Sequence, residues 1–221
     1  MRIPNIIPAS CGDFFAGTTS DPVPLASRVY TFTIMQVPLF PLNTVLFPEG
    51  PLPLRIFEPR YLGMISRCVK EDTPFGVLLI RDGDEAGPAT THHVGTLSRV
   101  TDWYQGSDGL LGITAIGTER FQLLSAERQD DGLNVGEIEL LPPVRPLALP
   151  AEHKALPHIL DSVLNDLGRL YEDLERRYDD GVWVAWRFVE ILPIDLETKQ
   201  AMLENDDIPA CLKLIEEVLH R

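Results

Sequence analysis

The sequence is poor in positive charge and lacks a basic cluster. Its 221 residues contain 19 Lys and Arg against 33 Asp and Glu, a formal net charge of −14. The tightest positive pair, Arg176-Arg177, is flanked by Glu175 and by Asp179-Asp180. Nucleic-acid binding draws most of its affinity from cationic side chains that neutralise phosphates. We therefore expect neither nucleic acid nor an anionic membrane surface as a partner.

Long apolar runs and a cysteine framework are also missing. No apolar run approaches the roughly 20 residues that cross a bilayer, so we expect no membrane span. The cysteines, Cys11, Cys68 and Cys211, lie far apart and form neither a CxxC motif nor a Cys/His cluster. This spacing is typical of free thiols in a reducing compartment, because cytosolic disulfides are rare. The expected location is the cytoplasm.

Motifs of catalytic and metal sites are absent as well. A P-loop requires Gly immediately before Lys, so that backbone amides cradle phosphates, and no lysine here follows a glycine. The sequence contains neither GxSxG nor HExxH. His92-His93 lies near Asp82, Asp84 and Glu85, but adjacent strand residues point to opposite faces, so we interpret this region as a solvated turn. We expect no enzymatic activity, no cofactor and no metal.

Turn residues are concentrated in the first 150 residues, which hold 30 of the 35 Gly and Pro (16 Gly and 19 Pro in all). Residues 1–34 lack a clear period and predict a poorly ordered leader, with Met35 as a candidate natural start. From residue 35 to 150, short apolar runs alternate with turn signals such as Asp108-Gly109 and Asp131-Gly132, which favour hairpins. The predicted strands are Thr44–Phe47, Phe75–Ile80, Val94–Val100, Leu110–Ile116, Phe121–Leu124 and Leu133–Leu141. Strands at this spacing favour an antiparallel barrel.

Helical periodicity dominates residues 151–221. Apolar residues recur at helical spacing from Leu156 to Tyr178, which predicts one long helix that ends at Asp179-Asp180-Gly181. Other helices are predicted at Trp183–Leu192, Leu196–Glu204, Ile208–Leu219 and, within the β-rich part, Pro59–Glu71. The predicted fold class is α+β. A β-barrel domain at residues 35–150 precedes an α-helical bundle at residues 151–221.

Two neighbouring segments resemble a known family. Residues 38–48 read PLFPLNTVLFP and residues 52–61 read LPLRIFEPRY. Together they are similar to the signature of the substrate-binding domain at the N-terminus of Lon-type ATP-dependent proteases. Weaker matches follow in the same order at Phe75-Gly76-Val77, His93–Thr96, Gly117–Phe121, Trp186-Arg187, Leu192-Pro193 and Lys199-Gln200. The resemblance covers about residues 36–215.

The resemblance implies a PUA-like pseudo-barrel followed by a helical bundle, and a role in recognising unfolded or tagged polypeptides. The ATPase and peptidase modules of a Lon protease do not lie within these residues. The resemblance therefore implies a stand-alone, non-catalytic recognition module that recruits clients to a separate ATP-dependent protease or chaperone. A second hypothesis is a small-molecule-binding or enzymatic domain that uses the cleft between barrel and bundle. RNA binding, by analogy with other PUA-like barrels, is disfavoured by the negative charge.

The candidate peptide-binding residues are aromatic or cationic: Phe57, Arg60, Tyr61, Trp103, Tyr104 and Trp186. Arg60 and Tyr61 lie close to Arg55 and Glu58, and for these four the structural alternative is an internal charge network that locks strand to helix, with Phe57 plugging the core. Trp183 and Trp186 are three residues apart, as on one packed helix face. Trp103-Tyr104 adjoins a polar turn and can expose at least one ring. We expect the site in an apolar groove between barrel and bundle, with strand-edge hydrogen bonds as one mode of binding.

Overall fold

The computed structural model describes residues 33–85, 87 and 89–220, and Phe32–Arg221 forms one compact unit. The leader predicted at residues 1–34 lies outside the described residues except for Thr33 and Ile34, and Ile34 already begins a strand. That Met35 is the natural start stays a prediction. No helix in the described part of the chain is both long and apolar enough to cross a membrane.

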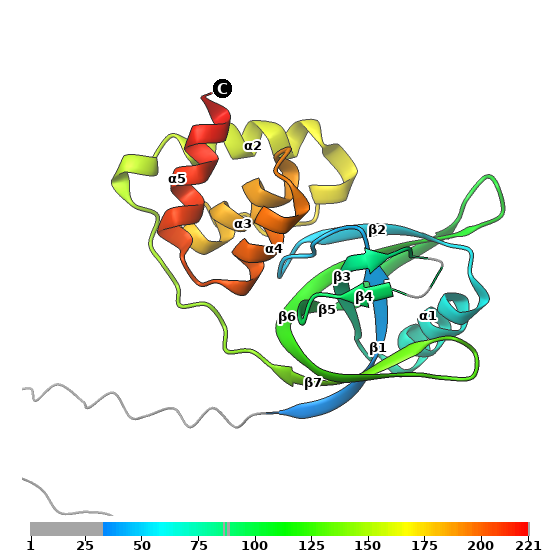
Figure 1. The fold of residues 1–221 in the computed structure, drawn as a ribbon. Coiled ribbons are helices and arrows are strands. Elements are labelled where there is room, and N and C mark those ends of the chain that lie inside the picture. The colour runs from blue at the N-terminus through cyan, green and yellow to red at the C-terminus, as the bar shows by residue number, and fades with distance from the viewer. Residues whose placement is uncertain (1–32, 86, 88, 221) are drawn as a thin grey trace, which may run out of the picture. The chain divides into compact units, whose positions relative to one another are not determined.

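Five strands close into a barrel, and two more extend it (Figure 1). The strands are β1 Ile34–Leu42, β2 Pro51–Ile56, β3 Phe75–Gly83, β4 Ala89–Thr91, β5 Val94–Gln105, β6 Leu111–Arg128 and β7 Asn134–Leu140. The circuit runs β1-β7-β6-β5-β3, and β3 returns to pair with β1. β2 pairs with β6 and β4 pairs with β3. Every pair among the described residues is antiparallel except β1 with β3, so the predicted antiparallel pseudo-barrel is confirmed, with an added parallel pair.

β6 is 18 residues long. Its first part, from Leu111 to Ile116, pairs with both β2 and β5, and its last part, from Phe121 to Arg128, pairs with β7. The prediction of two separate strands here, Leu110–Ile116 and Phe121–Leu124 with a turn at Gly117, is wrong. A Cβ atom on Gly117 would lie 2.3 Å from the backbone oxygen of Phe47. This glycine therefore permits a close backbone approach within a continuous strand, a common use of glycine in strands.

The strand predicted at Thr44–Phe47 is also wrong. This segment is an irregular connection between β1 and β2. Its apolar residues are buried in the core, so their apolar character reflects burial and not a strand. The sequence failed to predict β1, β2 and β4. Pro51 and Pro53 resemble turn signals, yet β2 tolerates them because, within the described residues, it pairs with β6 alone and its other edge needs no donors. The strands predicted at Phe75–Ile80, Val94–Val100 and Leu133–Leu141 are confirmed as β3, β5 and β7. β3 and β5 continue beyond the predicted ends, and β7 is one residue shorter at each end.

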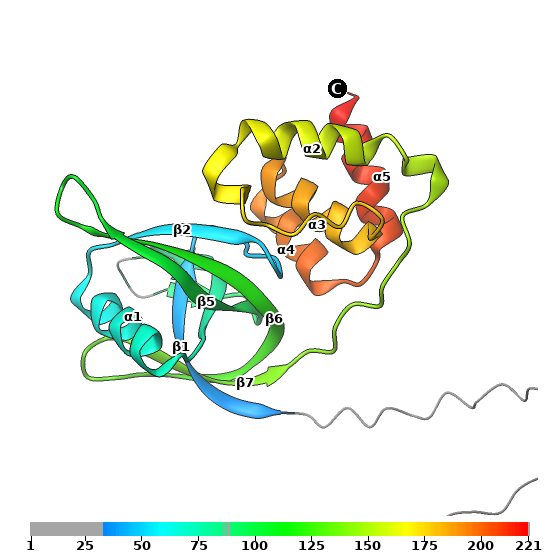
Figure 2. The ribbon, with the colours of Figure 1, turned by 180° about the vertical axis from the view of Figure 1, so that it is seen from behind.

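Helix α1 spans Pro59–Glu71 and confirms the helix predicted there. Pro59 occupies the first turn, where its missing N–H is not needed. Asp72 ends the helix in the left-handed conformation, with φ 50°. The buried face packs into the barrel core through Tyr61, Met64, Ile65 and Cys68. α1 therefore lies over one end of the barrel (Figure 2).

Short helices make up the second part of the fold. They are η1 Ala151–His153, α2 Leu156–Asp166, η2 Gly168–Tyr171, α3 Gly181–Ile191, α4 Leu196–Glu204 and α5 Ile208–Leu219. The predictions for α4 and α5 are confirmed to the residue, and that for α3 to within two residues. The single long helix predicted from Leu156 to Tyr178 is wrong, because Gly168 adopts φ +64° just after α2 ends. Asp180 does not end that helix but caps the start of α3.

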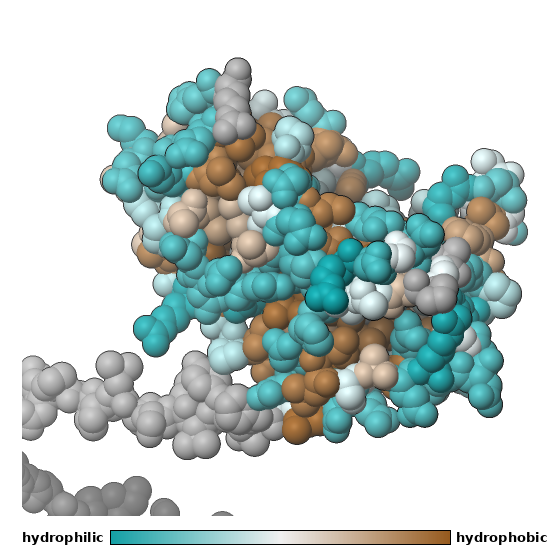
Figure 3. All heavy atoms as spheres, in the orientation of Figure 1, coloured by the Kyte–Doolittle hydropathy of each residue, from teal (hydrophilic) through white to brown (hydrophobic). Residues whose placement is uncertain are grey.

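Barrel and bundle share one hydrophobic core cluster. Phe47, Leu79 and Val94 of the barrel pack with apolar residues of α2, α3, α4 and α5. On the face drawn in Figure 3, hydrophilic residues cover much of the surface, and hydrophobic ones gather both over the helical part and over the lower part of the barrel. Residues on both sides of position 150 belong to one compact unit. The division of the chain into two domains at residue 150 stays a prediction.

Candidate functional site

The junction between barrel and bundle is held by side chains that donate to backbone carbonyls. Arg187 Nη2 of α3 donates to the carbonyl of Pro48 at 2.8 Å. Gln200 Nε2 of α4 donates to Val94 at 2.9 Å, and Arg120 Nη1 of β6 donates to Leu203 at 2.7 Å. Such hydrogen bonds, with charged donors in two of three cases, fix the geometry of the surfaces beside them.

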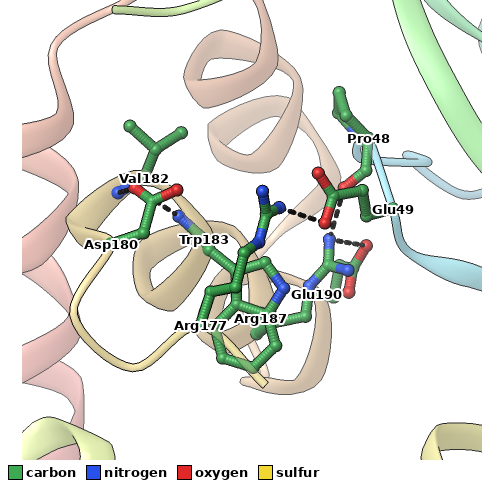
Figure 4. Close-up of polar contacts among 8 residues, drawn as sticks. All are labelled: Pro48, Glu49, Arg177, Asp180, Val182, Trp183, Arg187 and Glu190. Carbon is green, nitrogen blue, oxygen red and sulfur yellow. Dashed lines mark hydrogen bonds and ion pairs between the residues drawn. The ribbon is translucent and has the colours of Figure 1, made fainter. Parts of the chain in front are cut away.

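A buried ion pair lies beneath this junction (Figure 4). Arg187 is 0% exposed and donates to Glu190 Oε1 at 3.0 Å. Burial raises the pKa of Glu190 to about 7, and the nearby charges of Arg187 and Lys199 offset only part of this effect. Burial also lowers the pKa of Lys199, whose Nζ donates to the carbonyl of Glu190 at 2.9 Å. The Glu190 carboxyl group is therefore protonated in part at neutral pH.

A cleft of about 370 Å³ opens beside this junction. Its walls combine the β1–β2 connection, β6, the proline-rich segment after β7 and the start of α3, and the lining residues include Pro48, Glu119, Pro142, Pro146, Trp183 and Trp186. Trp183 and Trp186 are 2% and 8% exposed. The indole Nε1 of each is buried and has no hydrogen-bond partner within the described part of the chain. Two residues that line the cleft thus each carry a buried indole donor without a described partner.

A second cavity, of about 550 Å³, lies on the outer face of β2, β5 and β6. Its far wall is η2 and the segment that follows, with Arg169, Leu170, Asp173 and Leu174. Glu49 lines both this cavity and the cleft. The Glu49 carboxylate accepts a hydrogen bond from Arg177 (Figure 4), so the residue that lines both hollows also forms an ion pair between the β1–β2 connection and the bundle.

Residues 36–221 match the ATP-dependent protease La (LON) substrate-binding domain. The chain belongs to this family. The family's substrate-binding domain is the recognition part of a Lon protease, not its catalytic part, so membership supports a role in substrate recognition. The α+β fold agrees with that of solved Lon N-terminal domains.

Individual relatives support the same assignment. A Lon protease from Anaeromyxobacter dehalogenans is 25% identical over 193 residues, which are 84% of this chain and 23% of the relative. Protein cereblon from Xenopus tropicalis is 30% identical over 111 residues, 48% of this chain and 24% of the relative. The chain thus spans about a quarter of the length of these curated relatives. A solved Lon N-terminal domain protein from Xanthomonas campestris is 33% identical with a TM-score of 0.67, covering 83% of this chain and 98% of that one.

Arg60 and Tyr61 make contacts that stabilise the fold of this protein. Arg60 donates to the carbonyls of Gly132 and Glu85, each at 3.0 Å, and pairs with Glu58 at 2.8 Å. Tyr61 is buried, with its ring stacked on Phe40 at a centroid distance of 3.9 Å. Arg60 and Glu58 thus form part of the charge network considered as the structural alternative, whereas Arg55 pairs with Asp108 on the surface. The other part of that alternative is wrong, because Phe57 does not plug the core but is 63% exposed.

The remaining candidates lie in two places. Trp103 and Tyr104 are 65% and 50% exposed on β5, near the β5–β6 turn, and the Tyr104 ring lies over Gly112, where a Cβ atom would be 2.3 Å from it. Trp186 alone of the six predicted residues lines the cleft between barrel and bundle. Phe57 and Tyr61 line a separate hollow of about 430 Å³. The structure thus distributes the predicted residues over three surfaces.

Sequence reasoning missed Glu49 and Arg177 as site residues and assigned Trp183 to core packing. The cleft combines residues 48–49, 141–146 and 177–186, which no local motif connects. One signal was available, since a proline-rich stretch precedes a helix with two tryptophans on one face. No group of three or more His, Cys, Asp or Glu that could hold a metal ion occurs among residues 33–85, 87 and 89–220.

Proposed function

We propose that this Lon-type domain is a non-catalytic module that binds unfolded polypeptide in the cleft between barrel and bundle. The observation that carries the proposal is the pair of unpartnered indole N–H donors of Trp183 and Trp186. A buried donor without a partner costs free energy, and an acceptor from a ligand would recover it. A polypeptide supplies such an acceptor at every residue, in its backbone carbonyl.

The cleft walls fit an apolar polypeptide segment. Pro142, Pro143 and Pro146 line one side and have no backbone N–H to offer, so on that side a bound segment meets apolar rings and not donors. Tryptophan is a frequent anchor in protein-binding surfaces because its ring buries a large area and its N–H gives direction. The volume of about 370 Å³ accommodates a few residues of a longer chain.

The strand edge that was considered as a second binding mode has limited capacity. Pro51 and Pro53 of β2 cannot donate to an added strand, and β2 pairs on its other side with β6. Recognition through the side-chain donors of the cleft is therefore favoured over strand addition at β2. A small-molecule ligand in the same cleft stays the alternative function.

We further propose that bound clients pass to a separate ATP-dependent protease or chaperone in the cytoplasm. Two features support this part. The family is named for the substrate-binding domain of such a protease. Cys68 and Cys211 are free, buried thiols, which suits a reducing compartment.

Binding is tested by calorimetric titration with an unfolded model polypeptide, such as a reduced and alkylated protein. Trp183→Phe and Trp186→Phe each remove the indole N–H and keep an aromatic ring. Each should weaken binding by about 2- to 12-fold, the range for one hydrogen bond of about 0.5–1.5 kcal/mol. Trp103→Phe is the matched control, since this tryptophan is exposed on β5 and does not line the cleft.

The proposal fails if wild-type protein does not bind at high micromolar concentration. It also fails if Trp183→Phe and Trp186→Phe bind the polypeptide with the same affinity as wild type and Trp103→Phe, while thermal melting shows all the variants folded. A saturable small molecule that competes for the cleft, with no polypeptide binding, would favour the alternative.

A further inference from the structure

Glu49 has an unusual backbone conformation. Its φ is +64°, a left-handed value that non-glycine residues rarely adopt and that costs about 1 kcal/mol or more. Two backbone hydrogen bonds hold the turn, from Glu49 N to the carbonyl of Gly117 at 2.8 Å and from Gly50 N to that of Phe47 at 3.0 Å. In this conformation the Glu49 side chain points to the Arg177 guanidinium (Figure 4). Strain of this kind persists where a side chain must reach a particular place.

That place is the boundary between the two hollows. Glu49 lines the cleft of about 370 Å³ and the cavity of about 550 Å³. The side chains of Arg177 and Glu49 are 38% and 45% exposed, so their ion pair lies near solvent. Exposed pairs contribute little free energy and open readily.

The contacts beneath this pair do not depend on it. Arg187 is fully buried and donates to the carbonyl of Pro48, the residue next to Glu49. Gln200 and Arg120 hold the junction at two further points. The outer ion pair can therefore open while barrel and bundle stay in contact.

We propose that Glu49 and Arg177 form a removable barrier across a single groove, and that the groove takes an extended polypeptide segment that carries Lys or Arg. This inference rests on the proposed function and extends it beyond the cleft. With the barrier closed, only a short segment fits in the cleft. With the barrier open, a longer chain continues past Glu49 into the second cavity.

Charge favours a basic segment. The two hollows are lined by Glu119 and Asp180 on one side of the barrier and by Asp102 and Asp173 on the other. No cationic side chain pairs with these four within the described residues. Arg120 is engaged with Asp206 at 2.8 Å, and Arg177 with Glu49. Arg169 is the third cation of the lining, so the two hollows together hold five carboxylates against three guanidinium groups, and their field attracts positive charge.

The test compares two unstructured probe peptides of Gly, Ser, Leu and Lys. The short probe has about 4 residues and spans about 13 Å, and the long probe has about 12 residues and spans about 40 Å when extended. Each is titrated into wild type, Glu49→Gln, Arg177→Gln and the control Glu217→Gln. Glu217 is exposed on α5, so its variant removes a negative charge away from the groove.

Both barrier variants should bind the long probe about two- to fivefold more tightly relative to the short probe, the range that loss of one exposed ion pair allows. The control should keep the wild-type ratio. The variants change the charge in opposite directions, so a pure charge effect would shift the ratio in opposite directions. Opposite shifts, or the wild-type ratio in both variants, would overturn the barrier.

The occupant is tested with a long probe in which Glu replaces Lys. It should bind wild type at least fivefold more weakly at low salt, and the difference should shrink as salt screens the field. Equal affinity for both long probes would overturn the basic occupant. If wild type binds neither the short nor the long basic probe, the proposed function itself fails. If it binds both and the variants leave the ratio unchanged, only the barrier fails.

Discussion

The buried carboxyl group of Glu190 predicts how the stability of the protein changes with pH. Its pKa in the folded protein is about 7, against an ordinary value of 4.5, because burial disfavours the charged form. The folded protein therefore holds this proton more tightly than the unfolded chain does. The resulting stabilisation is fully present below about pH 4.5 and is lost as the pH rises through about 7.

The magnitude follows from the two pKa values. They differ by about 2.5, which at about 1.4 kcal/mol for each pH unit corresponds to about 3 kcal/mol. About 2.5 kcal/mol of this falls between pH 5 and pH 8. The effects of Arg187 and Lys199, the cations near the carboxyl group, are already included in this pKa. A loss of this size is a large share of the stability of a typical domain.

The assay is urea unfolding at pH 5 and pH 8, followed by the fluorescence of the buried tryptophans. Glu190→Gln keeps the shape of the side chain and removes its titration. Wild type should lose about 2.5 kcal/mol more free energy of unfolding than Glu190→Gln between the two pH values. Glu217→Gln, on the surface of α5, should behave like wild type. The difference between proteins cancels the contributions of all other titrating groups.

Equal pH dependence in wild type and Glu190→Gln would refute the reasoning. It would mean that the carboxylate stays ionised beside Arg187 throughout this range, so that the ion pair outweighs burial. A larger pH dependence in Glu190→Gln would refute it as well.

Two further predictions concern the same junction. Gly50→Ala should destabilise the protein by about 1–3 kcal/mol in urea unfolding. A Cβ atom there would lie 1.8 Å from Glu190 Oε1, so the buried pair of Glu190 and Arg187 would have to move. Unchanged stability would show that this pair shifts freely. Asp180→Ala should lower the free energy of unfolding by about 1 kcal/mol, because the Asp180 carboxylate accepts hydrogen bonds from Val182 N and Trp183 N at the start of α3. Asp180→Asn keeps a capping oxygen and should lose much less stability in the same assay.

Much of the helical part could be predicted from sequence because its signals are local. α1 and α5 each carry a proline in the first turn and an apolar stripe of helical period, and both were placed to the residue. The long helix failed at Gly168, because an apolar period continues through residues that fold as a short 3₁₀ segment and a loop. Apolar period alone does not reveal where a backbone reverses.

The β part was harder, because the roles of Gly and Pro depend on distant residues. Gly117 is inside β6 since the backbone of Phe47 approaches it, and Pro53 is inside β2 since that strand has one free edge. The cleft was harder still. Trp186 could be selected by residue type, but its neighbours in the cleft come from β6 and from the β1–β2 connection, far away in the chain. Only the folded structure brings them together.

The way in which bundle side chains hold the barrel has a consequence for mutational tolerance. Arg187 and Gln200 donate to the main chain of Pro48 and Val94, so their partner atoms exist whatever side chain stands at those positions. Replacements at 48 that keep the backbone path should preserve the hydrogen bond there, and at 94 the replacement must also keep the packing of Val94 in the shared core, whereas replacements of the two donors abolish both bonds. A random mutational library should therefore tolerate more replacements at Pro48, which is only partly buried, than at the donor Arg187. The surface beside the cleft could diversify for new clients without loosening the fold.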